Sequence, residues 1–307
     1  MVKFIVKRLL ALIPVLLGIN LVVFSIMSLS GDPALVVLGQ SSTEEAREIW
    51  RNEHGLDEPF IVQYADNLKG IVTGNLGRSY VSNRDVMGEF ASRLPVTLIV
   101  ALGSLIVSAL IIGVPFGILS AIKQYSALDY ACTFLALLFF AMPTFALGLL
   151  LMLCFSVNLK IFPVSGIVDP AGYVLPILTN GILSSTSILR MTRSSMLEVT
   201  RQDYVRTIRA KGAPESYVVL KHQLKNAMPS ILTVIGISFG ISLGGVVVIE
   251  SVFSLPGVSS LLLEGVNSLD RPTVTACATL LAFAFCLVNL IVDILYAVVD
   301  PRLREQL

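Results

Sequence analysis

Charge, histidine and cysteine are all scarce in this sequence. Only 14% of its 307 residues are charged and 55% are hydrophobic, which excludes an ordinary soluble globular domain. Two histidines, His54 and His222, leave little material for a histidine metal site or a proton relay. The cysteines fall inside apolar runs without metal-ligand spacing, which predicts buried free thiols rather than a disulfide framework. They are Cys132, Cys154, Cys277 and Cys286.

Catalytic and nucleotide-binding motifs are missing as well. No G-x-x-x-x-G-K-[ST] pattern occurs, so the chain has no phosphate-binding loop of its own. An intramembrane hydrolase would need a nucleophile and a base, and both histidines fall in polar loops. We therefore expect a protein that is not an enzyme and holds no cofactor.

Long apolar runs are what the sequence has in abundance. Six of them reach the length of about 20 residues that crosses a bilayer, which predicts an all-α integral membrane protein with six transmembrane helices. Lys3, Lys7 and Arg8 precede the first run, which predicts an uncleaved helix with its N-terminus inside the cell. The runs are residues 9–28, 96–122, 130–157, 173–191, 230–249 and 274–299.

A polar region separates the first two runs. Residues 31–95 carry ten acids against six bases, and turn residues divide them into short helices. Ser42 and Glu45 form a capping-box pattern that opens one helix, which Gly55 ends; Pro59 begins another. We expect a small extracytoplasmic helical insertion that caps the membrane helices, with contact to a partner as the alternative. Trp50 is expected to pack inside it or to anchor it at the membrane interface.

The charge balance reverses in residues 198–229, which we call the basic loop. Eight cations from Arg190 to Lys225 stand against three acids. Such a charged island between apolar runs belongs in water beside the membrane, and the positive-inside rule assigns it to the cytoplasm. One interpretation is an anchor that touches only anionic lipid headgroups. The other is a docking element for a second protein.

The positions of glycine and proline inside the basic loop favour the docking element. Residues 203–211 contain no glycine or proline, Gly212 can end a helix there, and Pro214 suits the start of a second helix. Lipid binding needs charge but no such defined turn. An apolar face on the first helix is expected to be covered by a partner. The candidate docking residues are Tyr204, Val205, Arg206, Thr207, Ile208, Arg209, Lys211, Gly212, Pro214 and Glu215.

The segment DYVRTIRAKGAPESYVVLKHQLKNAMP, residues 203–229, resembles the cytoplasmic coupling loop of binding-protein-dependent ABC importer permeases. The closest branch is the one that handles dipeptides, oligopeptides, glutathione and nickel. The superfamily's Glu-Ala-Ala is replaced here by Arg206-Thr207-Ile208, although Gly212 keeps its glycine. Further matching fragments occur in order along the whole chain. They are Gly31-Asp32-Pro33, GLDEP at 55–59, GNLG at 74–77, Ala141-Met142-Pro143, ESVF at 250–253 with Pro256-Gly257, NLIVD at 289–293 and Asp300-Pro301-Arg302.

The resemblance implies a type I importer permease fold and a set of partners. Those partners are a second homologous permease, two ATPase subunits that bind ATP and magnesium, and an extracytoplasmic solute-binding protein, with no nucleic acid. It implies a bacterial cytoplasmic membrane protein with both termini inside. It divides the chain into residues 1–30 (tail and first helix), the insertion 31–95, the permease core 96–299 and the tail 300–307. The implied substrates are di- and oligopeptides or glutathione-like peptides, with nickel or a metal chelate as the alternative.

Several residues inside the apolar runs are candidates for packing or gating. Gly236, Gly240 and Gly244 form a stripe that lets another helix approach, either from this chain or from a second permease; Gly113 and Gly117 form a smaller one. Three prolines are expected to break or kink their helices. They are Pro115, Pro143 and Pro176.

Only two acids stand clearly within apolar segments, Glu250 and Asp293. Structural pairing is the favoured role for each; a proton or ion relay, as in an ion-coupled secondary transporter, is the alternative and would need more such groups. Glu250 is expected near the outer end of its helix, within reach of water. With Pro256 and Gly257, which form a turn, it is a candidate for an outer gate.

Overall fold

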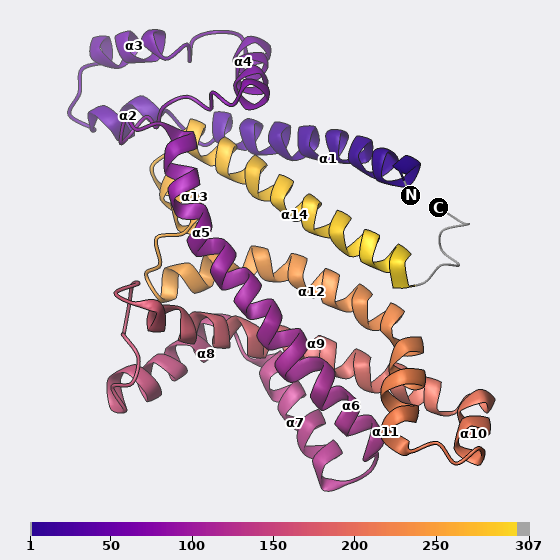
Figure 1. Cartoon of the computed structure of the whole chain (residues 1–307). Coiled ribbons are helices and arrows are strands. Elements are labelled where there is room, and N and C mark those ends of the chain that lie inside the picture. Colours follow the sequence, from indigo (N-terminus) through magenta and orange to yellow (C-terminus); the bar gives the residue numbers. More distant parts are fainter. Residues whose placement is uncertain (1, 300–307) are drawn as a thin grey trace. The chain divides into compact units, whose positions relative to one another are not determined.

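The structure is a computed structural model that describes residues 2–299; the side-chain surroundings of residues 2–7, 243–245, 292–293 and 295–299 lie outside the description. The described elements are helices, with one isolated antiparallel bridge between Arg78 and Asp85 (Figure 1). In order they are α1 (Val2–Leu29), α2 (Pro33–Leu38), α3 (Glu44–Glu53), α4 (Phe60–Thr73), α5 (Val86–Leu105), η1 (Ile106–Gly113), α6 (Val114–Ile122), α7 (Ala127–Ala141), α8 (Thr144–Leu151), η2 (Met152–Asn158), η3 (Pro170–Tyr173), α9 (Val174–Thr200), α10 (Asp203–Ala210), α11 (Glu215–Tyr217), η4 (Val218–Gln223), α12 (Leu224–Val252), α13 (Val258–Asn267) and α14 (Arg271–Val299).

The helices confirm the membrane-spanning composition. Five of them in the described part of the chain are long and apolar enough to cross a membrane, and α7 with α8–η2 makes a sixth if this bent pair is one span. The pair bends by 108° at Met142 and Pro143, so the predicted break at Pro143 is confirmed. Pro176 instead sits in the first turn of α9, where a missing N–H costs little. Pro115 lies inside the second span, directly after the π-helical segment η1, so the helix is locally irregular beside it.

Three predicted helix ends were wrong. The second span begins at Val86 rather than residue 96 and contains Pro95 in its interior. The fourth continues past residue 191 to Thr200, and the fifth begins at Leu224 and contains Pro229. In each case the charged residues near the helix end were assigned to a loop. On the helix, ion-pair partners or water at the membrane edge accommodate these residues.

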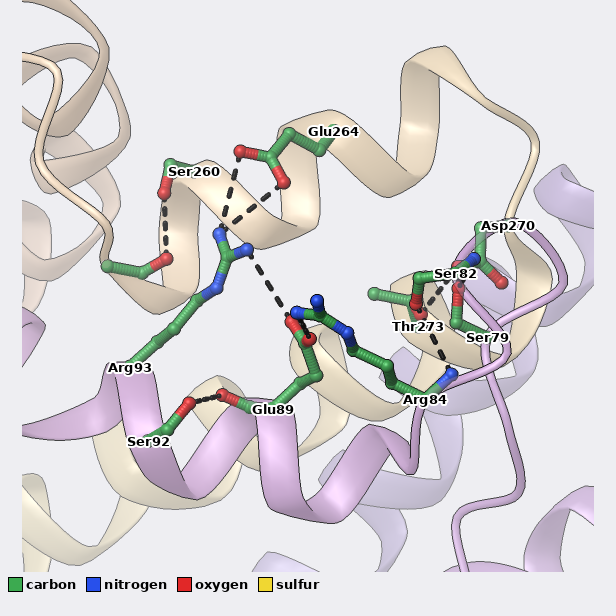
Figure 2. A network of polar contacts seen from close by, with 11 residues as sticks. Ser79, Ser82, Arg84, Glu89, Ser92, Arg93, Ser260, Glu264, Asp270 and Thr273 are labelled. Atoms are coloured by element: carbon green, nitrogen blue, oxygen red, sulfur yellow. Dashed lines mark hydrogen bonds and ion pairs between the residues drawn. The ribbon is translucent and has the colours of Figure 1, made fainter.

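The chain divides into two compact units, each described here by itself. One comprises residues 6–97 and 256–286. In it Phe90 of α5 packs with Val258 and Leu261 of α13 and Cys277 of α14. Figure 2 shows Arg93 of α5 reaching Glu264 of α13 and Glu89 of its own helix, while Asp270 accepts hydrogen bonds from the loop before α5.

The polar insertion belongs to this unit and is helical as predicted. Helix α3 is capped one residue later than expected, because the Thr43 hydroxyl, not that of Ser42, accepts the hydrogen bond from the Ala46 N–H. Trp50 stacks on His54 with ring centroids 4.0 Å apart and meets Tyr80 edge-on. The tryptophan therefore packs within the insertion.

The other unit comprises, among the described residues, 2–5, 98–255 and 287–299, and α9 lies at its centre, packed against η1, α6, α7, α8 and α12. Two glycines bring the second span onto α9. A Cβ at Gly113 would lie 2.6 Å from Cγ2 of Ile188, and one at Gly117 would lie 2.6 Å from Cβ of Thr192. This smaller glycine stripe therefore serves packing within the chain.

All four cysteines are free, as predicted, but Cys154 is exposed rather than buried. An apolar run in a membrane protein has a surface that faces lipid, so an apolar neighbourhood in the sequence does not imply burial within the chain.

Candidate functional site: the basic loop and its base

The basic loop folds into two helices separated by a turn, as its glycine and proline positions predict. Helix α10 spans Asp203–Ala210, and Gly212 follows in the left-handed region with φ +79°. This conformation is strained for residues with a side chain. Pro214 then caps α11, which continues through the π-helical segment η4 into α12.

An ion pair closes the turn between the two helices. Arg209 donates from Nε to Oε2 of Glu215 at 3.0 Å and from Nη2 to Oε1 at 2.5 Å. The carboxylate raises the pKa of the Arg209 guanidinium above its usual value. Such a two-point contact fixes direction as well as distance. It holds α10 against α11 across Gly212.

The expected apolar docking face was wrong at Val205, whereas Tyr204 is 37% exposed and its docking role stays a prediction. Val205 is fully buried within the chain, and Ile208 is half-buried. Tyr204 accepts a hydrogen bond from Asn226 Nδ2 at 3.0 Å, and partial burial raises the pKa of its phenol. This face of α10 therefore packs back on η4 and α12, because so short a helix is stable only when packing covers its apolar side.

Other residues form the exposed surface of the loop. Leu220 is 60% exposed and Tyr217 43% exposed. Arg206, Thr207, Lys211, Gly212, Pro214 and Glu215 are also exposed. Two large exposed apolar side chains among the charged residues of such a loop are typical of a protein interface. The sequence did not single out Leu220, although its place among apolar residues of the second helix marks it.

The base of the loop is a buried cluster that joins four elements. Ala121 of α6, Met196 of α9, Val219 of η4, and Ala227 and Ile231 of α12 pack together. The base of the loop is therefore packed against both of the long helices that flank it. A displacement of the loop must displace the ends of α9 and α12.

A buried ion pair beside this base was missed in the sequence. Asp129, 2% exposed at the start of α7, accepts hydrogen bonds from Arg193 Nε and Nη2 of α9 at 2.7 and 2.8 Å. It also accepts from the Ser120 hydroxyl and from the Tyr125 N–H at 2.9 Å. This pair, which we call the inner ion pair, ties the α6–α7 turn to α9. Arg193 was counted with the cations of the basic loop, and Asp129 was not singled out.

One exposed face of α9 is polar. Ser187, Arg190 and Ser194, spaced at helical intervals, are exposed and line a cavity of about 710 Å³ with residues of α7 and α12. The Arg190 guanidinium lies 5.8 Å from the Phe140 ring centroid. A charged face on a membrane-spanning helix faces water or protein rather than lipid.

The remaining candidates do not form a site with the loop. Gly236 is buried and Gly240 half-buried on α12, which packs on α9, where Asn180 Nδ2 donates to Ser242 Oγ at 2.6 Å. Gly244 lies outside the residues whose surroundings are described. The stripe thus stays a prediction.

The residues predicted to form an outer gate differ in how exposed they are. Glu250 is fully buried, which corrects its expected contact with water; its backbone oxygen accepts from Leu255 N–H at 2.8 Å, so the chain folds back over it. Pro256 is exposed and Gly257 caps α13. The side chain of Asp293 lies outside the described residues.

Known proteins match the whole length of the chain. Residues 113–305 match the inner membrane component of binding-protein-dependent transport systems, and residues 1–101 match the N-terminal part of the membrane component of such systems. The chain is 40% identical over 305 residues, 99% of either protein, to the glutathione transport system permease proteins GsiC of Escherichia coli K12 and Salmonella typhimurium LT2.

Solved structures agree on the fold. Two inward-facing structures of the MetNI methionine ABC transporter cover 70% of this chain with TM-scores of 0.60 and 0.61, at 18% identity and 97% coverage of their own chain. The chain belongs to the binding-protein-dependent transport permeases: it is an inner-membrane permease of a bacterial ABC importer, in the peptide and glutathione branch, with the type I fold.

Proposed function

We propose that this permease forms half of a translocation path for glutathione-like peptides, delivered by a solute-binding protein. A second homologous permease completes the path, and two separate ATPase subunits bind ATP and magnesium. The observation that carries the proposal is the 40% identity to glutathione permeases across 99% of the chain. It favours peptides over nickel or a metal chelate.

The polar face of α9 supports a peptide substrate. Arg190 is exposed on α9, ten residues before the end of this helix at Thr200, which is about 15 Å along the axis at 1.5 Å per residue. An exposed arginine on a membrane-spanning helix needs a water-filled path or a partner. Glutathione carries carboxylates, and a guanidinium is the side chain best matched to a carboxylate.

Transport is driven through the basic loop, which faces the cytoplasm together with both chain termini. Leu220, Tyr217 and the cations around them dock into a groove on an ATPase subunit. Closure of the ATPases on ATP moves the loop, and the packed base passes the movement to α9 and α12, which alternate between inward and outward states. Glu250, Pro256 and Gly257 are candidates for the outer gate.

An ion-coupled secondary transporter is the rival mechanism, and it would need unpaired charges in mid-membrane. Asp129 accepts four hydrogen bonds, two of them from Arg193 and one each from Ser120 and the Tyr125 N–H. This carboxylate is therefore paired within the chain, which favours a structural role over ion coupling.

Uptake by proteoliposomes tests the proposal. The complete importer with its binding protein should accumulate labelled glutathione when ATP is enclosed, and Arg190→Gln should lower uptake at least tenfold. Arg201→Gln, which removes an exposed cation just beyond the same helix, should leave uptake within about twofold. ATP-independent uptake driven by an ion gradient, or equal uptake by both variants, would contradict the proposal.

A further inference from the structure

Helix α4 of the insertion has a polar side that packs on α14. Gln63 accepts a hydrogen bond from Arg271 of α14 at 2.6 Å. One turn later, Asn67 donates to Thr275 of the same helix at 3.2 Å. These two contacts fix the rotation of α4 about its own axis, so the residues on its far side point away from α14.

The far side of α4 is apolar and exposed. Its residues recur at i, i+4, i+7 and i+11, the spacing of one helix face; they are Ile61, Ala65, Leu68 and Val72. We call this face the α4 stripe. Ile61 is 77% exposed and Val72 is 86% exposed, while Ala65 is exposed and Leu68 is half-buried. Large apolar side chains aligned in this way mark a surface that another apolar partner covers.

A third side of α4 packs on α1, and its contacts show how deep the helix lies. The ring centroid of Phe24 in α1 lies 5.4 Å from that of Phe60 and 5.5 Å from that of Tyr64 (Figure 1). The Tyr64 hydroxyl donates to the Leu17 carbonyl at 3.3 Å. Phe24 and Leu17 precede the end of α1 at Leu29 by five and twelve residues, which is about 8 and 18 Å along the axis.

These contacts lie inside the apolar run of α1, not beyond it. Residues 8–29 are long and apolar enough to cross a membrane, and the hydrocarbon core of a bilayer is about 30 Å thick. The phenol of Tyr64 therefore reaches the depth of the acyl chains, and the α4 backbone lies one tyrosine side chain away. Leu68 is one turn from Tyr64, so the α4 stripe borders the side that packs on α1. Leu17 is itself exposed, as is usual for a side chain that borders lipid.

We propose that α4 is an interfacial helix and that the α4 stripe lies against the acyl chains of the bilayer, in the leaflet at the Leu29 end of α1. In the proposed topology this is the outer leaflet. Helices of this kind bury one apolar face about 5–10 Å into the boundary between headgroups and acyl chains. Lys69, exposed beside the stripe, suits this boundary, because its stem is apolar and its ammonium extends to water. This attachment does not depend on which solute the permease transports.

Quenching of a single tryptophan by brominated lipid tests this placement. Trp50, the one tryptophan in the sequence, is removed by Trp50→Phe in every variant. The full-length chain with Val72→Trp is placed in nanodiscs of phosphatidylcholine, with or without bromine on the acyl chains near the glycerol. Because bromine quenches on contact, the brominated lipid should remove at least about half of the emission of a side chain at this depth. Ile61→Trp, at the other end of the α4 stripe, should respond alike, which guards against one substitution that disturbs the fold.

Thr73→Trp is the matched control. Thr73 follows Val72 directly and is also exposed, but it lies on the polar flank of α4, because successive helical residues turn by about 100°. Its emission should respond to iodide in the water and not to brominated lipid, whereas that of Val72→Trp should show the reverse. Quenching of both stripe variants by iodide alone would place the α4 stripe in water and overturn the proposal. Equal quenching of Val72→Trp and Thr73→Trp by brominated lipid would overturn it as well.

Photocrosslinking in the complete importer distinguishes lipid from protein as the occupant. Benzoylphenylalanine at Val72 should, on irradiation in membranes, add the mass of one phospholipid to the permease, and the same probe at Thr73 should not. A crosslink from Val72 to the solute-binding protein or to another subunit in place of the lipid adduct would show that a protein covers the stripe. That result, or no adduct at all, would overturn the proposal.

Discussion

Removal of the inner ion pair should lower the free energy of unfolding and reduce substrate-stimulated ATP hydrolysis. Breaking a buried pair by removing one partner costs about 3–5 kcal/mol, but 28% of the Arg193 side chain stays exposed. We therefore expect Asp129→Asn to lower the free energy of unfolding by about 2–3 kcal/mol. Ser120 and the Tyr125 N–H donate to different oxygens of Asp129. Asparagine has one acceptor oxygen and keeps one of these two contacts, so the loss arises at Arg193 and at the other donor.

The measurement is a double-mutant cycle in reversible unfolding from mixed micelles. Arg193→Gln and the double variant complete the cycle, and the coupling energy should exceed about 1.5 kcal/mol. Asp203→Asn is the matched control, because its side chain is 97% exposed and lies 3.9 Å from Arg206; it should change nothing measurable. In the assembled importer, Asp129→Asn should also lower substrate-stimulated ATP hydrolysis. A coupling energy near zero would refute the reasoning that this pair ties α7 to α9.

Three further results are expected. Gly212→Val should abolish transport while the protein still inserts, because a left-handed backbone is strained by about 1–2 kcal/mol for a residue with a side chain; Gly212→Asn, which tolerates this conformation, should retain most uptake. Leu220→Asp should abolish copurification of the ATPase without lowering the melting temperature of the permease. A variant that lowered both copurification and the melting temperature would show that Leu220 packs inside the chain. Cysteines at Ser42 and Ser216 should react with an impermeant thiol reagent from opposite sides of the membrane, and labelling of both from outside would contradict the proposed topology.

The parts of the fold that sequence could predict are those governed by local rules. Apolar runs located the spans, and Gly212 and Pro214 located the turn of the basic loop, because left-handed backbone and a missing N–H each suit few positions. The break at Pro143 follows from the same reasoning. None of these features depends on which segments lie side by side.

What sequence could not predict depends on tertiary contact. Asp129 and Arg193 are separated by 64 residues, so neither could be recognised as the other's partner. Val205 was assigned to a partner protein although the chain itself buries it, because helical periodicity reveals an apolar face but not what covers it. Glu250 was placed in water by its position along the helix, and the fold-back after Val252 buries it.

The continuity of α9 has a mechanical consequence. Its 27 residues make a rod of about 40 Å at 1.5 Å per residue, and residues 177–200 contain no proline at which it would bend. Tilting such a rod by about 5° about one end moves the other end by roughly 3.5 Å, more than the width of a water molecule. The loop fixed to its last turn therefore works on a long lever arm. Under the proposed coupling, a small displacement of the basic loop by an ATPase would move the opposite end of α9 by this distance.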